Sequence, residues 1–429
     1  MPHNVQVMIM AGGRGDRLMP LTKDRCKPAV PFGGRYRIID FVLSNFINSG
    51  FTKINVLTQY KANSLIVHIN RSWNISGVLD GYVNPIPAQQ RTGDDWYLGT
   101  ANSVYQNLDI LGSTSPNYVA VFGGDHIYKM NVRLMFQEFV ESGADVMVST
   151  IPYPRCEASR FGVIKINDTW EIVEFLEKPE EPPCIPNDPD RSLVSMGNYF
   201  FKVGVLREVL NEDMRNAESE HDFGRNILPH MVEAGYKVRA YDFSKNRVPG
   251  EPDDEDVYWR DVGTVDGYYD ANMDLRSVHP QFNLYNRHWP IKSLHRSLPP
   301  VKFVFADVGT RYGHAIDSIV AAGTIISGAT VRDSVISNNN FIHSYSELEG
   351  CIVLDHADVF RHCKLRKVIV DKYSKVEEGC IIGYDVERDE MRFKVTPGGV
   401  TVLPKNAVIR ANGQILDLIT GEEIFPALE

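Results

Sequence analysis

Residues 319–382 follow a pattern that repeats every 17 residues. Aliphatic side chains recur there at spacings of 6, 6 and 5 residues, and each of the twelve positions is Ile, Val or Leu. The positions are Ile319, Ile325, Val331, Ile336, Ile342, Leu348, Val353, Val359, Leu365, Val370, Val376 and Ile382. One inward aliphatic residue on each short strand predicts a three-sided parallel β-helix whose coils stack on one another. The alternative, a β-sandwich, would show a period of two and irregular spacing.

Residues before the repeat alternate between strand-like and helix-like segments. Expected strands cover residues 5–10, 54–58, 118–122, 145–151, 161–166, 171–176 and 199–203. Expected helices cover residues 37–48, 62–73, 100–111 and 131–142. This alternation is typical of an α/β domain with a mostly parallel sheet.

A connection without a clear period separates the two patterns. It carries Pro280, Pro290, Pro299 and Pro300, as an interdomain linker would. We therefore expect an α/β domain over residues 1–275, a linker over residues 276–310 and a β-helix domain over residues 311–429.

Charge and composition argue against several classes of function. The formal net charge is -10, whereas nucleic-acid binding normally leaves a basic surface. No apolar run approaches the ~18 residues of a membrane span, and the start of the chain does not resemble a secretion signal. The six cysteines include no C-x-x-C pair, so we expect reduced thiols in a cytoplasmic protein.

A glycine turn follows the first expected strand. Gly12, Gly13 and Gly15 free backbone N–H groups to face a phosphate, and Arg17 and Lys27 supply positive charge. The string matches neither G-x-x-x-x-G-K-[ST] nor G-x-G-x-x-G, which disfavours a P-loop or dinucleotide fold. Seven basic residues against two acidic ones between positions 14 and 37 indicate a pocket for a small anion. A turn beside solvated charges is the plainer interpretation of this loop alone.

Two aspartates are candidates for a magnesium site. Asp125 follows an apolar strand in FGGDH, at the carboxyl end where open α/β sheets bind ligands. Asp261 lies in YWRDVGT. Two carboxylates together with phosphate oxygens suffice for Mg²⁺. The sequence leaves open whether the two meet, and either alone is more often a turn or N-cap residue.

Glu177 and Lys178 end another expected strand, just before a proline-rich loop. At a strand end both side chains can reach one ligand, Lys178 a phosphate and Glu177 sugar hydroxyls, although an exposed strand end is the plainer interpretation. Upstream, the segments PAQQR and WYLGT predict a mobile aromatic loop. Glutamine amides there suit a base, and Gly99 lets a ring approach the backbone.

Together these strings closely resemble the glucose-1-phosphate adenylyltransferases, the bacterial ADP-glucose pyrophosphorylase family. The resemblance runs along nearly the whole chain, through strings such as FGGRYRIIDFVLSNFINSG, PAQQR, GGDHIY, FLEKP, HDFGRNILP and YWRDVGT. It implies a Rossmann-like nucleotidyltransferase domain followed by a left-handed parallel β-helix for regulation and oligomerisation. It also implies transfer of the adenylyl group of ATP to α-D-glucose 1-phosphate, giving ADP-glucose and pyrophosphate on the way to glycogen.

The resemblance assigns a role to each candidate residue. The triphosphate would lie on Gly12, Gly13, Arg14 and Gly15, with Arg17 and Lys27 at the transferring phosphoryl group and Gln89 and Gly99 at the adenine. The glucose 1-phosphate contacts would be Tyr97, Gly162, Glu177, Lys178 and Ser195, and Asp125 and Asp261 would hold Mg²⁺.

Members of the family are typically homotetramers, regulated by small anionic effectors that bind between the domains. The candidates for such a pocket are Arg25, Arg37, Arg366 and Lys405. Some bacterial members carry Lys, His and Arg where this chain has Asp24, Pro31 and Ser113, so the identity of the effectors stays open.

Three other functions remain as alternatives. The first is a related nucleotidyltransferase that uses another nucleoside triphosphate. The second is a regulatory subunit without activity, but such a chain would have lost residues such as Arg17, Asp125 or Lys178. The third is an acyltransferase, since hexapeptide β-helices often use a histidine for acetyl transfer. The histidines in question are His314, His343, His356 and His362, for which a surface position is the plainer explanation.

Overall fold

The computed structural model describes residues 4–75, 81–91, 95–186, 188–252, 256–307 and 311–424. Contacts divide the chain into two compact units. Unit 1 comprises Met1–Gly13, Phe41–Trp259 and Asn286–Ile291, and unit 2 comprises Arg14–Asp40, Arg260–Tyr285 and Lys292–Glu429. Two short segments from the first 285 residues therefore group with the β-helix, and the boundaries expected at residues 275 and 310 stay a prediction.

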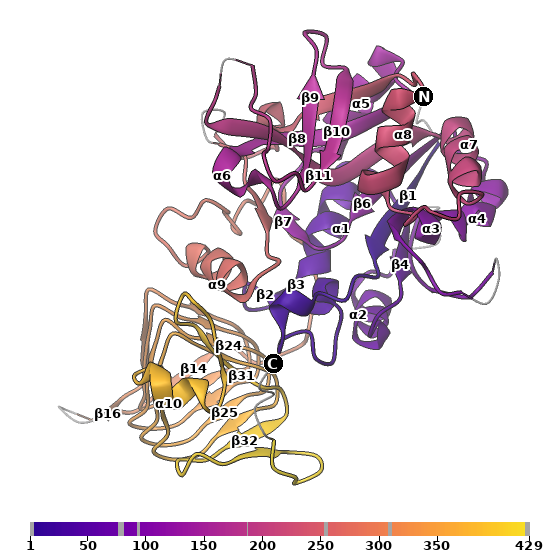
Figure 1. Ribbon diagram of the computed structural model, residues 1–429. Helices are drawn as coiled ribbons and strands as arrows, with labels where there is room; N and C mark the ends of the chain where they lie inside the picture. Colours follow the sequence, from indigo (N-terminus) through magenta and orange to yellow (C-terminus); the bar gives the residue numbers. More distant parts are fainter. Residues whose placement is uncertain are drawn as a thin grey trace. The chain divides into compact units, whose positions relative to one another are not determined.

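A nine-stranded mixed sheet forms the centre of unit 1 (Figure 1). Pairing is parallel around β1 and antiparallel around β11. The order is β10 (Ile172–Glu177), β9 (Gly162–Ile166), β11 (Arg191–Lys202), β6 (Tyr118–Gly123), β1 (Val5–Ala11), β4 (Lys53–Thr58) and β5 (Tyr82–Pro87), with β8 (Val146–Pro154) on β11 and β12 (Val238–Asp242) on β8. The expected α/β domain is confirmed, and β5 and β12 are strands that the sequence did not reveal.

Helices of unit 1 follow the predicted segments closely. The expected helix over residues 100–111 is two helices, because Asn107 leaves helical geometry between them. The helices are α1 (Ile38–Asn48, which begins in unit 2), α2 (Asn63–Ser72), α3 (Thr100–Tyr105), α4 (Leu108–Thr114), α5 (Val132–Ser142), α6 (Arg155–Ala158), α7 (Val203–Asp213), α8 (Leu228–Glu233), the π-helix η4 (Phe223–Ile227) and the 3-10 turn η5 (Phe243–Lys245). The short strand β7 (His126–Tyr128) follows β6.

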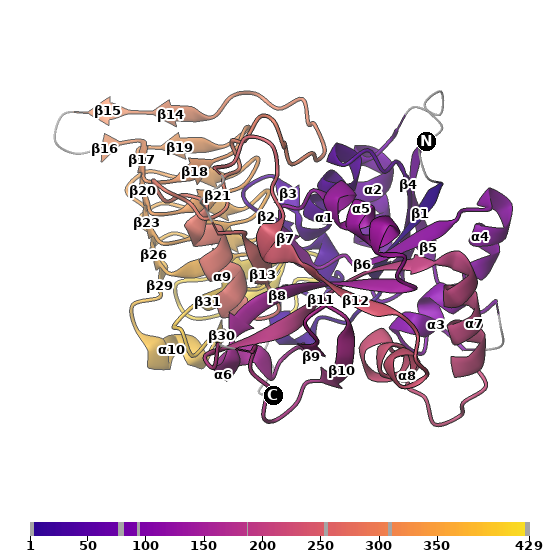
Figure 2. The same ribbon diagram turned by 90° about the horizontal axis from the view of Figure 1, so that it is seen from above.

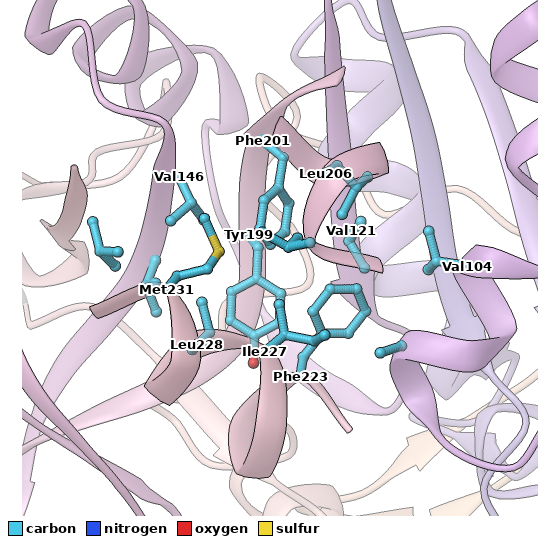
Figure 3. Close-up of a cluster of buried hydrophobic side chains, with 14 of the residues drawn as sticks. Val104, Val121, Val146, Tyr199, Phe201, Leu206, Phe223, Ile227, Leu228 and Met231 are labelled. Atoms are coloured by element: carbon cyan, nitrogen blue, oxygen red, sulfur yellow. The ribbon is translucent and has the colours of Figure 1, made fainter. Parts of the chain in front are cut away.

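One hydrophobic core of unit 1 joins the sheet to α3, α7, α8 and η4. Figure 3 shows the Tyr199 ring between Met231 and Leu228 on one side and Phe223 on the other. The Phe223 ring lies 5.6 Å from that of Tyr199 and 5.7 Å from that of Phe201, between ring centroids. Burying aromatic rings of this size contributes strongly to stability, so the start of η4 is fixed to the sheet.

Unit 2 contains the predicted parallel β-helix, built from three sheets. Figure 2 shows one of them as a stack of strands in chain order. That sheet is β17 (His314–Ile316), β20 (Thr330–Arg332), β23 (Glu347–Glu349), β26 (Lys364–Arg366) and β29 (Ile381–Ile382). The second is β18 (Ile319–Val320), β21 (Val335–Ile336), β24 (Ile352–Val353), β27 (Val368–Val370), β31 (Thr401–Leu403) and β30 (Lys394–Val395). The third is β14 (Lys302–Val304), β19 (Ile325–Ser327), β22 (Phe341–Ile342), β25 (Asp358–Val359), β28 (Lys375–Val376), β32 (Ala407–Ile409) and β33 (Ile415–Asp417).

Shorter elements complete unit 2. They are the 3-10 turns η1 (Asp16–Leu18) and η2 (Lys27–Ala29), the hairpin β2 (Pro31–Phe32) and β3 (Tyr36–Arg37), β13 (Trp259–Asp261, which begins in unit 1), α9 (Val265–Asp274), the hairpin β15 (Ala306–Asp307) and β16 (Arg311–Tyr312), and α10 (Val386–Glu390). Residues 276–301, within the expected linker, form neither helix nor strand. The segment from Gly383 to Val400, which contains α10 and β30, interrupts the repeat before β31 resumes it.

Ten of the twelve predicted inward positions are confirmed as buried, and Ile319 and Ile325 are wrong by one residue. Register pairs Val320 with Ile336 and Ile326 with Ile342, so the inward residues of the first coil are Val320 and Ile326. A shift of one residue moves a side chain to the other face of a strand. Both predicted residues have an aliphatic neighbour, and residue type therefore could not distinguish the two registers.

Corners of the β-helix are built by residues in the left-handed region. Positive φ angles recur 17 residues apart at three corners of a coil, in the sets Asp333, Gly350, Lys367, then Gly328, Tyr345, His362, Gly379, and then Asn339, His356, Tyr373. Non-glycine residues rarely adopt this conformation, so neighbouring coils must support them. Stacked rings supply part of that support: Tyr345 lies on His362 at 4.9 Å and His356 on Tyr373 at 5.0 Å.

All six cysteines are free thiols, as expected. Of the helices in the described ranges, none combines the length and the apolar character that a bilayer crossing requires.

Replacing one inward residue tests the coil ladder. We expect Leu365→Ala to lower the free energy of unfolding by about 2–5 kcal/mol, because Leu365 is fully buried and leaves a cavity. Urea unfolding followed by circular dichroism measures this loss. The adjacent Lys364→Ala is the matched control and should change stability by less than about 0.5 kcal/mol, since this side chain is outward and exposed. Equal effects of the two changes would contradict the assigned faces.

Candidate functional site

The glycine turn after β1 is open on one side and crowded on the other. In unit 1, a Cβ on Gly13 would meet nothing within 4 Å, which leaves its backbone accessible. In unit 2, Gly15 has a φ of +70°, and a Cβ there would lie 3.0 Å from the Lys27 Cβ. The Thr22 hydroxyl donates to the Gly15 carbonyl at 2.9 Å. The turn therefore has a fixed shape in unit 2, and Gly15 is required for its conformation and for the close approach of Lys27.

Three of the predicted catalytic residues meet within unit 2. The Lys27 ammonium donates to the Asp261 carboxylate at 2.6 Å, and the Arg17 guanidinium lies 3.9 Å from its other oxygen. The Lys27 side chain is 8% exposed, that of Asp261 17% and that of Arg17 61%. A Cβ on Gly263 would lie 2.9 Å from Asp261 and 3.0 Å from Arg17, so this glycine leaves room for the group.

Asp125 lies in unit 1 immediately after β6, at the carboxyl end of a central strand, as expected. Its side chain is 36% exposed, and its Oδ1 lies 3.7 Å from the Nε2 of His126. The His126 ring packs on Trp259 with 5.2 Å between centroids, and its buried Nδ1 has no hydrogen-bond partner among the described residues. A carboxylate oxygen here is a donor of the kind that Mg²⁺ prefers.

Glu177 is held between two glycines at the end of β10. A Cβ on Gly162 would lie 3.0 Å from the Glu177 Oε2, and one on Gly224 would lie 2.7 Å from it. Lys178 has a φ of +50°, which turns the chain at the strand end, and its ammonium lies 2.8 Å from the Glu177 Oε1. The two side chains are therefore on the same side, as the sequence predicted, and the positive φ of Lys178 is the reason.

Ser195 lies in β11 beside a register shift. Its hydroxyl accepts a hydrogen bond from the Gly197 amide at 3.2 Å. Burial raises the pKa of the adjacent Tyr199 hydroxyl, which the hydrogen bond with Ser195 only partly opposes. Ser195 is therefore a mostly buried hydroxyl in the same sheet as Glu177.

The Tyr97–Gly99 segment is positioned by side chains from elsewhere in unit 1. The Gln59 amide accepts from the Tyr97 N–H at 2.9 Å and donates to the Tyr97 carbonyl at 3.2 Å. Burial raises the pKa of Tyr97, whose hydroxyl accepts from Asn107 at 2.9 Å. A Cβ on Gly99 would lie 2.3 Å from the His221 carbonyl oxygen, which alone explains this glycine. The exposed Gln89 accepts from the Arg91 guanidinium at 3.1 Å.

Two of the four regulatory candidates, Arg25 and Arg37, belong to a buried cluster of unit 2. Arg25 pairs with Asp371, and its buried Nη1 has no hydrogen-bond partner among the described residues. Burial, opposed by Asp40, lowers the pKa of Arg37 to about 10. Lys405 lies 3.6 Å from Asp24, the neighbour of Arg25 in the chain.

Arg366 has different partners. Its guanidinium lies 3.0 Å from Glu349 and over the Tyr384 ring, on the outer face of the sheet that contains β23 and β26.

Two further residues join the buried cluster. The Lys372 ammonium donates to Asp355 at 2.8 Å, and Arg296 lies 3.5 Å from the same carboxylate. Burial lowers the pKa of Lys372 to about 8, although Asp355 opposes the shift. Burial pushes the pKa of Asp355 upward, but Lys372 and Arg296 outweigh it and hold that pKa below its usual value. Neither Lys372 nor Arg296 was singled out in the sequence.

Three histidines of the β-helix have structural explanations. The His343 ring stacks between Phe341 at 3.9 Å and Phe360 at 5.1 Å, and its Nε2 lies 2.9 Å from Asp358. His356 and His362 occupy left-handed corners and stack on tyrosines. These contacts favour a role in the outer ladders over acyl transfer.

Sequence reasoning missed Gln59, Asn198 and His221. Gln59 directly follows β4, so the rule that ligands lie at carboxyl ends of strands could have found it. Asn198 is fully buried and accepts from the Gly123 amide at 3.3 Å. Nothing in the local pattern marked Asn198, because its partner comes from a strand 75 residues away.

Comparisons with known proteins agree with this geometry. The family described as nucleotidyl transferase matches residues 6–278, and the family described as GlmU-like, C-terminal hexapeptide, matches residues 299–403.

Similar proteins extend over nearly the whole chain. A glucose-1-phosphate adenylyltransferase of Deinococcus radiodurans is 49% identical over 407 residues, which cover 94% of this chain and 98% of the relative. That of Corynebacterium jeikeium is 48% identical, covering 95% and 99%, and that of Thermus thermophilus is 49% identical, covering 93% and 97%. With the candidate residues present and similarity of this extent, the chain belongs to the glucose-1-phosphate adenylyltransferase family.

Proposed function

We propose that this protein transfers the adenylyl group of ATP to α-D-glucose 1-phosphate, giving ADP-glucose and pyrophosphate. The observation that carries this conclusion is the meeting of Lys27 and Arg17 at Asp261, beside the glycine turn. Fixed charges of both signs next to an open backbone suit a triphosphate and a divalent ion. Similarity over more than nine tenths of the chain supports the same assignment. The product serves glycogen synthesis, the known role of this enzyme.

The reaction needs alignment and charge compensation rather than a protein nucleophile. A phosphate oxygen of glucose 1-phosphate attacks the α-phosphorus of ATP, the bond from that phosphorus to the bridging oxygen breaks, and pyrophosphate leaves with the electron pair. Gly12, Gly13, Arg14 and Gly15 would hold the triphosphate. Lys27 and Arg17 would neutralise the oxygens on which charge develops.

Enzymes of this family generally need a divalent metal, and we assign Mg²⁺ to Asp125 and Asp261. Carboxylate oxygens are the donors that this hard cation prefers, and it would neutralise charge on the bound phosphates. Chain connectivity supports the pairing: His126 packs on Trp259, and Asp261 follows Trp259 by two residues, a span of about 7 Å at most. When ATP binds, the Lys27 ammonium would leave the Asp261 carboxylate and pair with a phosphate oxygen instead.

Glucose 1-phosphate would lie along the Glu177 and Lys178 end of β10. The Glu177 carboxylate, held by Gly162 and Gly224, would accept from sugar hydroxyls, and the exposed Lys178 would bind the phosphate. Tyr97 and Ser195 complete the proposed contacts. Gln89 and Gly99 would line the adenine, although Gly99 is already required by the His221 carbonyl.

The Arg25 and Arg37 cluster is proposed as the site of small anionic effectors, in a homotetrameric cytoplasmic enzyme. Burial of Arg25, Arg37 and Lys372 costs free energy that the acids Asp40, Asp355 and Asp371 offset only in part. An anion would satisfy the free Nη1 of Arg25. Lys405 lies beside this cluster through Asp24, whereas Arg366 is a weaker candidate because Glu349 already neutralises it.

Measuring pyrophosphate release with each of four nucleoside triphosphates, with and without glucose 1-phosphate, tests the function. We expect release with ATP that depends on glucose 1-phosphate and on Mg²⁺. Preference for another triphosphate would favour a related nucleotidyltransferase, and absence of release would favour a regulatory subunit.

Asp125→Ala tests the metal assignment. We expect turnover to fall at least about a hundredfold, because charge on the phosphates is no longer compensated, while the melting temperature stays unchanged. Steady-state formation of ADP-glucose measures the loss. Asp168→Ala, at an exposed turn, is the control and should keep full turnover. An active Asp125→Ala enzyme would refute the role of Asp125.

Lys178→Ala tests the sugar-phosphate contact. The apparent KM for glucose 1-phosphate should rise about tenfold or more, with a smaller change in kcat, since the lysine is assigned to binding. Initial rates over a range of glucose 1-phosphate concentrations separate the two parameters. Lys165→Ala removes an exposed lysine that pairs with Glu174 on the same strand pair and should leave KM unchanged. An unchanged KM in Lys178→Ala would count against the assignment.

The effector cluster predicts a dependence on pH. Because Lys372 has a pKa near 8, its positive charge is largely present at pH 7 and lost by pH 9. Sulfate, whose own charge is constant over this range, should therefore bind roughly tenfold more weakly at pH 9 than at pH 7. Titration calorimetry measures the affinity.

Two variants complete this test. Lys372→Met should bind sulfate weakly at both pH values, whereas Lys364→Met, an exposed control, should behave as the wild type. A pH dependence that persists in Lys372→Met would mean that another group titrates.

A further inference from the structure

We propose that His221 is a positioning residue for glucose 1-phosphate. Its hydrogen bond to Asp213 holds one short turn against both the Tyr97–Gly99 segment and the Glu177 carboxylate. The position of this turn sets the affinity for glucose 1-phosphate. The inference rests on the proposed function, because these two segments are its assigned substrate contacts. All the residues involved lie within unit 1. The turn is Ser219–Gly224, which lies after α7 in the chain and includes Phe223 and Gly224, the first two residues of the π-helix η4.

His221 adopts an unfavourable backbone conformation that its side chain supports. Its φ is +53°, which costs about 1 kcal/mol for a residue with a Cβ. Its Nδ1 lies 2.7 Å from the Asp213 Oδ2, and both side chains are about nine tenths buried. Ser219 donates to the other Asp213 oxygen at 2.6 Å and accepts from the His221 amide at 3.0 Å. Asp213 ends α7, so the turn is fastened to a helix that is packed in the core.

The main chain of His221 meets the start of α3. Its carbonyl oxygen accepts from the Ala101 amide at 2.8 Å and from the Asn102 amide at 3.4 Å. The first amides of a helix have no partner within the helix, so this carbonyl takes the place of a cap. The same oxygen approaches Gly99 so closely that any Cβ there would lie at 2.3 Å. The position of His221 therefore fixes the residues directly after Tyr97.

The next three residues extend the connection to Glu177. The Asp222 carboxylate accepts from the Thr100 hydroxyl at 2.9 Å and from the Gly224 amide at 2.9 Å. The Phe223 amide donates to the Thr100 hydroxyl at 3.0 Å. Gly224 lies against Glu177, where a Cβ would be 2.7 Å from its Oε2. One turn thus contacts two segments that are 78 residues apart in the sequence, counted from Gly99 to Glu177.

The contacts of this turn explain why His221 keeps an unfavourable positive φ, which packing of the core does not require. The Phe223 ring already fixes the start of η4 in the core (Figure 3). A relaxed His221 would leave that core intact but would release its carbonyl from Gly99 and the α3 amides. The Asp213–His221 hydrogen bond therefore acts on the spacing between Tyr97 and Glu177 more than on the global fold.

Four variants test this inference. His221→Ala and Asp213→Ala each remove one partner of the hydrogen bond and should raise KM for glucose 1-phosphate about tenfold, with kcat reduced less than about threefold. His221→Asn should stay within about twofold of the wild type, because Asn tolerates a positive φ and its amide nitrogen can replace Nδ1 as the donor. His230→Gln is the matched control: its ring lies 3.2 Å from Glu212 in an exposed pair between α8 and α7, and its KM should not change.

Hydrogen exchange supplies a readout that does not depend on activity. Peptides covering residues 98–106 should exchange faster at Ala101 and Asn102 in His221→Ala and Asp213→Ala, but not in His221→Asn or His230→Gln. Wild-type KM and wild-type exchange in a folded Asp213→Ala enzyme would overturn the inference, as would an equal loss in His221→Asn and His221→Ala. If the wild type itself makes no ADP-glucose, the proposed function fails, and the exchange comparison still decides whether His221 holds the turn.

Discussion

A buried ammonium and a mostly buried carboxylate face each other at 2.6 Å in Lys27 and Asp261. Each would be costly to bury alone, and together they keep their charges where bulk water does not screen them. Reacting phosphates need both signs of charge at once, since cations must meet their oxygens and acids must hold a divalent ion. Two glycines leave room for this pair. Gly15 of the glycine turn packs on Lys27, and Gly263 packs on Asp261.

Several positions of the candidate site require glycine because neighbouring protein atoms leave no room for a side chain. Gly99 has an extended backbone that any residue could adopt, yet the His221 carbonyl leaves no room for a side chain. Gly224 likewise makes room for Glu177, and Gly162 makes room for the Phe175 ring as well as for Glu177. Such glycines are often explained by the ligand alone. In this protein they show that the segments proposed to bind the substrates are packed against one another.

Features that depend on residues adjacent in the sequence could be predicted, whereas contacts between residues that meet only in the folded protein could not. The 17-residue period gave the β-helix because aliphatic identity repeats, but it misplaced Ile319 and Ile325, where both candidate residues of a pair are aliphatic. Glu177 and Lys178 were recognised from a local string, whereas the positive φ that brings them together is a property of the folded strand end. Asn198 and Arg296 depend on partners far away in the sequence, and His221 and Lys372 on partners 8 and 17 residues away that they meet only in the folded chain.

The cluster around Arg25 in unit 2 contains more cationic than acidic side chains. Its four cations, Arg25, Arg37, Arg296 and Lys372, face three acids, Asp40, Asp355 and Asp371, and burial has already lowered the pKa of both Arg37 and Lys372. Asp371 pairs with Arg25 and compensates its charge, but a guanidinium has five N–H groups, and one carboxylate cannot satisfy all of them. The buried Nη1 of Arg25 has no partner among the residues described. An anion at this nitrogen would lower the cost of burying it, which is the physical basis of the effector site proposed for this cluster.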